Sequence, residues 1–119
     1  MRILSLTQHL PTDEQLSAGV VNYVRHDYVR ELLTINDLPD YDDLRLRAVR
    51  LAKIALESGA QGAMIGGAPY LMSHLEAELK AVGIVPMYAF SKRVSVDVVG
   101  NDGVVRKDSV FKHLGFYSA

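Results

Sequence analysis

A strand, a helix and a second strand follow one another in the middle of this sequence, and that pattern constrains its fold more than any other. A small apolar stretch at 60–65 ends at Gly66-Gly67, and Pro69 then suits the first turn of a helix. A fully apolar stretch at 84–90 follows the helix, as in a strand of a parallel sheet that is covered on both faces. The order predicts a βαβ unit and therefore an α/β fold.

Further elements of the same kind precede this unit. We expect a buried strand at 3–6, then a helix opened by the capping box Thr12-Asp13-Glu14-Gln15, then a short strand at 20–24. The segment 44–56 follows an acidic stretch and carries basic residues, which is typical of a well-capped helix. Its basic side chains are expected to be solvated, with Arg47 paired to Asp43 one turn earlier.

The pattern changes after Phe90. Valines alternate along 94–99, the turn residues Gly100-Asn101-Asp102-Gly103 follow, and 104–110 returns, which predicts a β-hairpin. A chain of 119 residues rarely divides into two cores. We therefore predict one domain over residues 1–119, a Rossmann-like three-layer α/β sandwich with a mostly parallel sheet and an antiparallel C-terminal hairpin.

Composition limits the chemistry. The chain has no cysteine, which excludes disulfides, thiolate nucleophiles and cysteine-based zinc sites. Its net charge of -1 argues against a general nucleic-acid binder, yet residues 1–90 carry -3 and residues 91–119 carry +2. No histidine or carboxylate spacing indicates a metal site, and no stretch approaches the ~20 apolar residues of a membrane span. We expect a soluble, cytoplasmic protein without a metal or cofactor.

Candidate binding residues follow the predicted parallel strands, because ligands of such sheets bind at the carboxyl ends of the strands. Thr7, Gln8 and His9 follow the first strand, where they either contact a ligand or simply lead into the helix. Gly66 and Gly67 allow the backbone to approach a ligand next to a helix N-terminus, although a glycine pair is also a common tight turn. Tyr70, on that helix, either stacks on a base or packs against the protein.

Two basic groups complete the candidates. Ser91, Lys92 and Arg93 follow the apolar strand 84–90 directly, so a hydroxyl and two cations are expected at its end, and a phosphate-bearing ligand explains them better than a solvated strand exit. Near the C-terminus, Lys112 and His113 either extend this cationic set or belong to a surface strand.

The chain resembles the small stand-alone ring nucleases of type III CRISPR systems, which are related to the CRISPR-associated Rossmann-fold (CARF) sensor domain. Four short segments in order along the chain carry the resemblance: His9-Leu10-Pro11-Thr12-Asp13-Glu14-Gln15, Gly67-Ala68-Pro69-Tyr70-Leu71-Met72, Pro86-Met87-Tyr88-Ala89-Phe90-Ser91-Lys92-Arg93 and Ser109-Val110-Phe111-Lys112-His113-Leu114. The resemblance implies a homodimer that binds a cyclic oligoadenylate, first of all the tetra-adenylate, across its two-fold axis. It also implies cleavage of the ring, which would end antiviral signalling.

The chemistry implied by the resemblance requires no metal, because a ribose 2′-hydroxyl attacks the neighbouring phosphate. Lys92 and Arg93 would bind phosphate and stabilise the developing charge, and Ser91 would orient the reacting groups. His9 or His113 would transfer protons.

Two other classes of function remain open on the sequence. The same residues would serve a module that binds a cyclic nucleotide without cutting it, since a site that positions phosphates looks alike in both. A scaffold that acts through protein contacts alone, like a receiver domain, is the other class. Receiver domains need acidic residues at the strand ends, whereas here these ends are basic.

Overall fold

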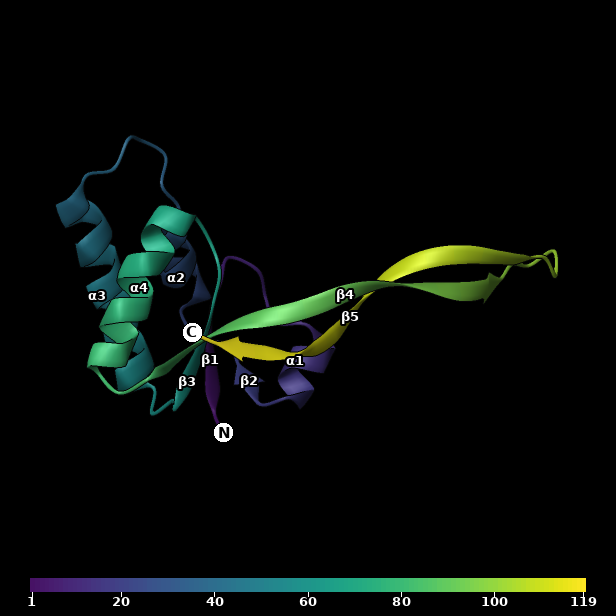
Figure 1. The fold of residues 1–119 in the computed structure, drawn as a ribbon, viewed down its shortest axis with the longest axis horizontal. Helices are drawn as coiled ribbons and strands as arrows, with labels where there is room; N and C mark the ends of the chain where they lie inside the picture. The colour runs from purple at the N-terminus through teal and green to yellow at the C-terminus, as the bar shows by residue number, and fades with distance from the viewer.

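A five-stranded sheet forms the centre of the protein, and the computed structural model describes all residues from Met1 to Ala119. Its strands lie in the order β2-β1-β3-β4-β5 (Figure 1). The first four run parallel to their neighbours, and β5 runs antiparallel to β4. The strand bounds are β1 Ile3–Leu6, β2 Val20–Val21, β3 Gly62–Ile65, β4 Val85–Val99 and β5 Val105–Ser118. This architecture confirms the predicted mixed α/β fold with a mostly parallel sheet and a C-terminal hairpin.

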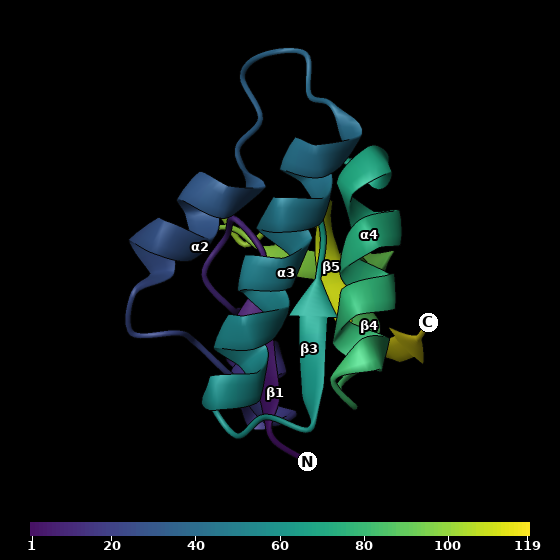
Figure 2. The same ribbon diagram turned by 90° about the vertical axis from the view of Figure 1, so that its left-hand side faces the viewer.

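Four helices connect the strands and lie on both faces of the sheet. Their bounds are α1 Asp13–Ser17, α2 His26–Leu33, α3 Tyr41–Glu57 and α4 Pro69–Ala81. Helices α2, α3 and α4 lie together on one face, and α1 lies on the other side of the sheet (Figures 1 and 2). Strand order explains this arrangement: β2 and β3 flank β1 on opposite sides, and right-handed crossovers in opposite directions place their helices on opposite faces. The third layer is thin, because α1 has only five residues.

The main core lies between the sheet and helices α2, α3 and α4. Alternate residues of a strand point to opposite faces, so Leu4 and Leu6 of β1 point into this core, where they join Leu51 and Leu75 from α3 and α4. The other face carries a smaller apolar cluster of Ile3, Val20, Met64 and Met87, against which Phe116 packs. Burial of these apolar side chains is the dominant favourable contribution to the stability of the sheet and its helices.

The local signals near the N-terminus act as predicted. The Thr12 hydroxyl accepts a hydrogen bond from the Gln15 backbone N–H, and Oε1 of Gln15 accepts one from the Thr12 backbone N–H, which completes the capping box of α1. Asp40 caps α3 in the same way through the N–H of Asp43. Helix α2 was not predicted, although its buried residues Val29, Leu32 and Leu33 have the i, i+3, i+4 spacing of an amphipathic helix.

Arg47 corrects the prediction that the basic face of α3 is merely solvated. The predicted pair with Asp43 forms, at 3.1 Å from Nε to Oδ1. In addition, Nη1 of Arg47 donates to the backbone carbonyl oxygens of Glu31, Leu32 and Thr34 at 3.3, 2.9 and 2.9 Å. These carbonyls lie at the C-terminal end of α2, where that of Glu31 also accepts the N–H of Thr34 and those of Leu32 and Thr34 have no backbone partner. Arg47 therefore joins α3 to α2.

The predicted end of the last parallel strand at Phe90 is wrong. Strand β4 continues without interruption to Val99, with one irregularity in its pairing at Phe90/Ser91. The residues from Ser91 to His113, here called the arm, form a two-stranded hairpin that projects far from the rest of the protein (Figure 1). The radius of gyration is 16.9 Å, whereas about 13.5 Å is expected of a compact chain of this length. The arm accounts for this excess.

No helix of the structure is long and apolar enough to cross a membrane.

Candidate functional site

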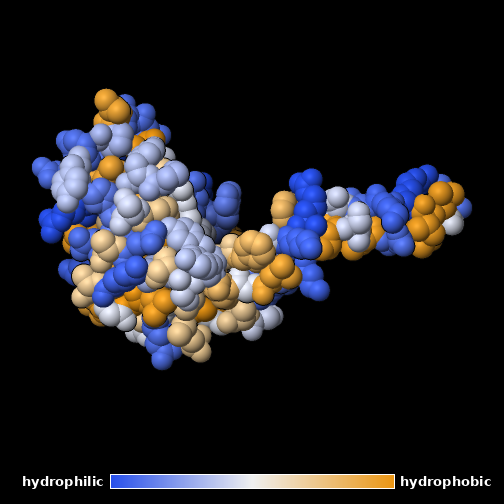
Figure 3. Space-filling view, viewed as in Figure 1, coloured by the Kyte–Doolittle hydropathy of each residue, from blue (hydrophilic) through white to orange (hydrophobic).

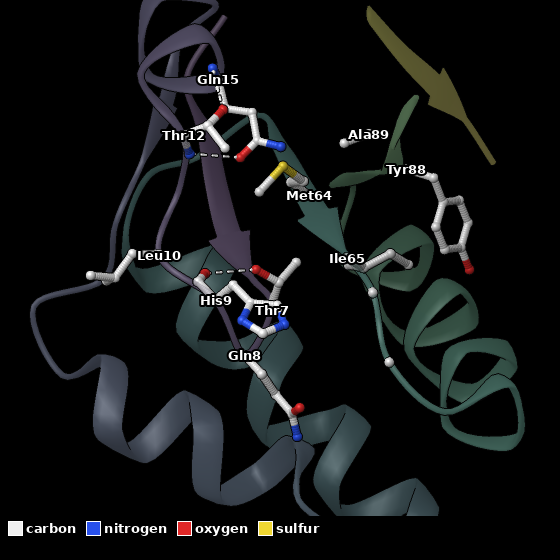
Figure 4. Close-up of a pocket in the computed structure, with 12 residues that line it drawn as sticks. Thr7, Gln8, His9, Leu10, Thr12, Gln15, Met64, Ile65, Tyr88 and Ala89 are labelled. Atoms are coloured by element: carbon white, nitrogen blue, oxygen red, sulfur yellow. Dashed lines mark hydrogen bonds between the residues drawn. The ribbon is translucent and has the colours of Figure 1, made fainter. Parts of the chain in front are cut away.

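A cavity of about 630 Å³ opens at the carboxyl ends of β1 and β3, beside Tyr88 and Ala89, where β4 passes beyond its parallel pairing with β3 (Figure 4). It lies where the parallel strands were expected to bind a ligand. The residues that line it are Thr7, Gln8, His9, Leu10, Thr12, Gln15, Met64, Ile65, Gly66, Gly67, Tyr88 and Ala89. Five of the predicted site residues are among them: Thr7, Gln8, His9, Gly66 and Gly67. Only two of these side chains are ionisable, the imidazole of His9 and the phenol of Tyr88.

The loop after β1 is held in place by hydrogen bonds at both ends of α2. The Thr7 hydroxyl donates to the carbonyl oxygen of His9 at 3.0 Å, and Nε2 of His26 lies 3.0 Å from the carbonyl oxygen of Thr7. Because a carbonyl only accepts, this contact places the proton of the His26 ring on Nε2. Sequence analysis missed His26, since nothing in its neighbourhood predicts a contact 19 residues away.

Gln8 points away from the cavity. Its Nε2 lies 3.4 Å from the carbonyl oxygen of Leu33 and 3.3 Å from the Thr34 hydroxyl, at the C-terminal end of α2 (Figure 4). The amide nitrogen therefore positions the loop, and only the stem and the amide oxygen of Gln8 remain for a ligand. In contrast, the His9 ring makes no hydrogen bond with another residue and lies beside Thr7 on the exposed surface of the loop.

The glycine pair forms the second wall, between β3 and α4. Gly67 has a φ of 154°, which residues with a side chain rarely adopt, and a Cβ there would lie 3.3 Å from Cε of Met72. Ala68 follows as the N-cap of α4, and no side chain caps this helix. Pro69, the first residue of α4, has no backbone N–H, and the N–H of Leu71 donates to the carbonyl oxygen of Ala68. Among the first three residues of the helix, only Tyr70 therefore has a backbone N–H without a backbone partner.

Tyr88 lines the third wall, and sequence analysis did not select it. Its hydroxyl points away from the cavity and donates to Oε2 of Glu76 on α4 at 2.8 Å. Burial, together with the hydrogen bond to Glu76 and the negative charge of that residue, raises the pKa of Tyr88 to about 12. The phenol therefore stays neutral under ordinary conditions and fixes the position of β4 against α4 at the rim of the cavity.

The predicted cations lie outside the cavity, on the arm. Lys92 and Arg93 follow Ala89 by three and four residues, which corresponds to about 10 and 13 Å along the strand. Neither residue forms an ion pair within the chain, and Arg93 lies over the ring of Phe111 at 5.1 Å. The reasoning that put them at a strand end fails because β4 does not end there.

The structure does bring the two predicted basic groups together. Ser91 pairs with His113 across the hairpin, and Lys92 pairs with Lys112. His113 also contacts the body of the protein: its backbone N–H donates to Oε2 of Glu14 at 3.1 Å. Its ring packs edge-on against Phe116, and its Nδ1 is buried without a hydrogen-bond partner. His113 thus lies at the base of the arm, where the arm meets α1.

Tyr70 lies apart from both groups. It is about half exposed and lines a separate hollow beside the loop that precedes α3, together with Leu38 and Pro39. The structure therefore separates Tyr70 from the cavity, although Gly66 and Gly67 are close to it in sequence. No group of three or more histidine, aspartate or glutamate side chains comes together as a metal-binding cluster.

Comparison with known proteins places the chain in a family. The model of the Uncharacterized protein MJ1673 family matches residues 1–117. The chain belongs to this MJ1673 family. The matched region contains the whole cavity and the whole arm, so both are parts of the family's domain. No curated protein and no solved structure matches the chain.

The arrangement in this MJ1673 family member suits a polar or anionic ligand. The cavity offers an imidazole and threonine hydroxyls, and the arm that continues from its rim carries Lys92, Arg93 and Lys112. A ligand with several phosphates could contact both regions.

Proposed function

We propose that this protein is a ring nuclease that binds and opens a cyclic oligoadenylate, with cyclic tetra-adenylate as the first candidate. One observation carries the proposal: a cavity at the carboxyl ends of β1 and β3 presents His9 and a glycine turn, and cations without an ion-pair partner follow on β4, which forms its rim. The resemblance of the four sequence segments to stand-alone ring nucleases supports the same class of ligand.

The proposed reaction is an internal transesterification. A ribose 2′-oxygen attacks the adjacent phosphorus, its proton passes to a base, the bond from phosphorus to the 5′-oxygen breaks, and the 5′-oxygen takes up a proton. The products are a linear oligoadenylate with a 2′,3′-cyclic phosphate at one end and a 5′-hydroxyl at the other. The reaction includes no redox step and consumes no water. The protein therefore has to position the 2′-oxygen and the phosphate, transfer two protons and stabilise the charge that develops on the phosphate.

The roles in this proposal follow from position. Lys92 and Arg93 would bind phosphates, and Ser91, at the base of the arm, would orient the ribose. His9 is the proton-transfer group inside the cavity, whereas His113 lies at the base of the arm beside Glu14. A homodimer with the ring across its two-fold axis would present each of these groups twice.

Cleavage would remove the second messenger of a type III CRISPR response and so switch off antiviral signalling. A test of the binding site uses the double variant Lys92→Ala with Arg93→Ala. We expect this variant to lose most of its affinity for cyclic tetra-adenylate, measured by calorimetry in EDTA. The matched control Arg50→Ala with Lys53→Ala removes the same charge from the exposed face of α3 and should bind normally. Equal binding by both double variants would contradict the proposal.

A second candidate is a sensor or sequestering module of the same fold, which would bind the ring without cutting it. One observation favours it: the cavity contains a single imidazole, whereas general acid-base cleavage uses both a base and an acid. A binding module would show tight binding of cyclic tetra-adenylate and recover the ring intact.

A further inference from the structure

The arm presents an apolar face that nothing in the chain covers. A two-stranded ribbon is marginally stable in water by itself, and the arm has no third strand or helix packed on it (Figure 1). Side chains alternate between its two faces, and one face, here called the valine face, carries Val94, Val96, Val98 and Val110. Apolar surface is visible between the charged side chains of the arm in Figure 3. Val98 and Val110 are exposed and Val94 and Val96 are partly buried, and an apolar stripe of this kind without a covering element indicates a contact surface.

The valine face has an ordered sequence of chemical groups from its base to its tip. Cross-strand pairing defines five levels, which are Phe90 opposite Gly115, Lys92 opposite Lys112, Val94 opposite Val110, Val96 opposite Asp108, and Val98 opposite Arg106. The opposite face is polar at its centre, with the pairs Ser95 and Ser109, and Asp97 and Lys107, and its exposed apolar side chains Phe111, Val99 and Val105 lie toward its two ends. The valine face is apolar at its centre and basic toward its base, and toward its tip Asp108 is followed by Arg106, which pairs with Asp102.

This pattern is complementary to itself. We propose that the arm binds the arm of a second copy of this chain, valine face against valine face and antiparallel, about a two-fold axis through the level of Val94 and Val110. The two-fold axis lies between the two packed faces and is perpendicular to the strands. Rotation about it places each strand opposite the same strand of the second copy. It places Val94 on Val94, Lys112 opposite Asp108, and Phe90 opposite Val98. The interface is isologous, since the same patch serves both subunits.

The charges of the monomer support this pairing. Lys92 and Lys112 lie directly opposite each other, which is unfavourable for two like charges on neighbouring strands. Neither lysine forms an ion pair within the chain, and Asp108 forms none either. In the proposed dimer Asp108 of the second copy neutralises Lys112, and the reciprocal contact forms on the other side of the axis.

The composition of the valine face favours a second copy of the chain over other partners. Nucleic acid would contact the cations of this face but would leave the valine stripe exposed to water. A bilayer would accept the valines but not Asp108 beside Val96. The proposed contact covers the valines and pairs the aspartate.

This proposal does not rest on the proposed function. Arg93 lies on the opposite face of the arm, stacked on Phe111, and stays accessible in the dimer. Lys92 lies opposite Val96 of the second copy, so the dimer covers its side chain, and only Arg93 of these two cations stays accessible to an anionic ligand. Dimerisation is measured without any ligand, so its outcome does not depend on ring binding.

The size of the arm sets the expected affinity. Its nine residues from Ser91 to Val99 extend about 30 Å at about 3.3 Å per residue, so one face is smaller than the roughly 800 Å² per partner of a standard interface. The dimer should therefore dissociate on dilution. Sedimentation velocity over a range of protein concentrations measures this directly.

A charge exchange tests the register. We expect Asp108→Lys alone and Lys112→Asp alone to weaken the dimer at least about tenfold, because each places like charges opposite each other across the axis. The double variant Asp108→Lys with Lys112→Asp restores opposite charges in both contacts and should dimerise like the original protein. Within one arm, Lys112→Asp also places an acid opposite Lys92, so the variant hairpin is not destabilised by the exchange.

A second test uses the centre of the interface. Val94→Lys should abolish the dimer, whereas the matched control Ser95→Lys adds the same charge on the opposite face and should not. Because the chain has no cysteine, Val94→Cys introduces a single thiol, and a short thiol-specific cross-linker should join it to the thiol of the second copy across the roughly 10 Å between the two packed faces. A protein that stays monomeric at high concentration overturns the proposal, including one that binds duplex DNA or vesicles as a monomer. Failure of the double exchange to restore the dimer overturns the register.

Discussion

The hydroxyl of Tyr88 donates a hydrogen bond to Glu76 at 2.8 Å, and this contact fixes β4 to α4 at the point where the strand leaves the body of the protein. The pKa of Tyr88 is raised from 10.0 to about 12, mainly because the phenol is buried and also because of Glu76. Between these two pH values the folded protein holds a proton that the unfolded chain releases. The free energy of unfolding should therefore decrease as the pH rises from about 10 to about 12.

The variant Tyr88→Phe checks this pH dependence. It lacks the ionisable group, so the part of the decrease that is due to Tyr88 should be absent when urea unfolding is measured at a series of alkaline pH values. Glu76→Gln keeps a hydrogen-bond acceptor but removes the charge, and the tyrosinate absorption of Tyr88 should then appear at a lower pH than in the original protein. An unchanged titration in Glu76→Gln would mean that Glu76 does not contribute to the shift.

Arg47 should contribute more to stability than the other basic residues of α3. Its guanidinium is mostly covered and donates to three carbonyl oxygens at the end of α2, so Arg47→Ala leaves these acceptors without their partner. We expect a loss of roughly 2 kcal/mol in the free energy of unfolding, measured with urea. Arg50→Ala, on the exposed side of the same helix, should change it by less than about 0.5 kcal/mol. Similar losses for both variants would contradict the role of Arg47.

Local sequence signals were sufficient for much of the fold. The capping box at Thr12, the glycine turn at Gly66 and the hairpin turn at 100–103 each depend on residues close in sequence, and each forms as predicted. The end of β4 could not be predicted in this way. The apolar stretch stops at Phe90, where β4 leaves the core. The strand continues nevertheless, because β5 pairs with it and supplies the backbone hydrogen bonds.

The predictions for the candidate site divide in the same way, between local sequence signals and tertiary contacts. Ligands of parallel sheets bind at the carboxyl ends of the strands, and this rule correctly predicted the position of the cavity and the residues Thr7, His9 and Gly66 that line it. It could not show that the Gln8 amide turns toward the end of α2, since this depends on a contact with Leu33, 25 residues away. It also placed Lys92 and Arg93 at the cavity, although they lie further out on the arm. Such errors arise where tertiary contacts decide the direction of a side chain or the length of a strand.

His9 distinguishes the proposed enzyme from a binding module. If His9 transfers a proton during cleavage, His9→Ala should lower the rate of ring opening by roughly 10²- to 10⁴-fold while affinity for cyclic tetra-adenylate changes little. His74→Ala provides the control, because His74 lies on α4 against Tyr41 and does not line the cavity. Rates that are equal for the two variants would remove His9 from the mechanism and leave the protein without a proton-transfer group in the cavity.

The central claim is that this protein opens a cyclic oligoadenylate by internal attack of a 2′-hydroxyl. The most direct measurement is incubation of the purified protein with cyclic tetra-adenylate in EDTA, followed by chromatography and mass spectrometry of the products. The account predicts linear oligoadenylates that carry a 2′,3′-cyclic phosphate and a 5′-hydroxyl, formed at a rate proportional to the protein concentration. Recovery of the intact ring, whether bound or free, would contradict it.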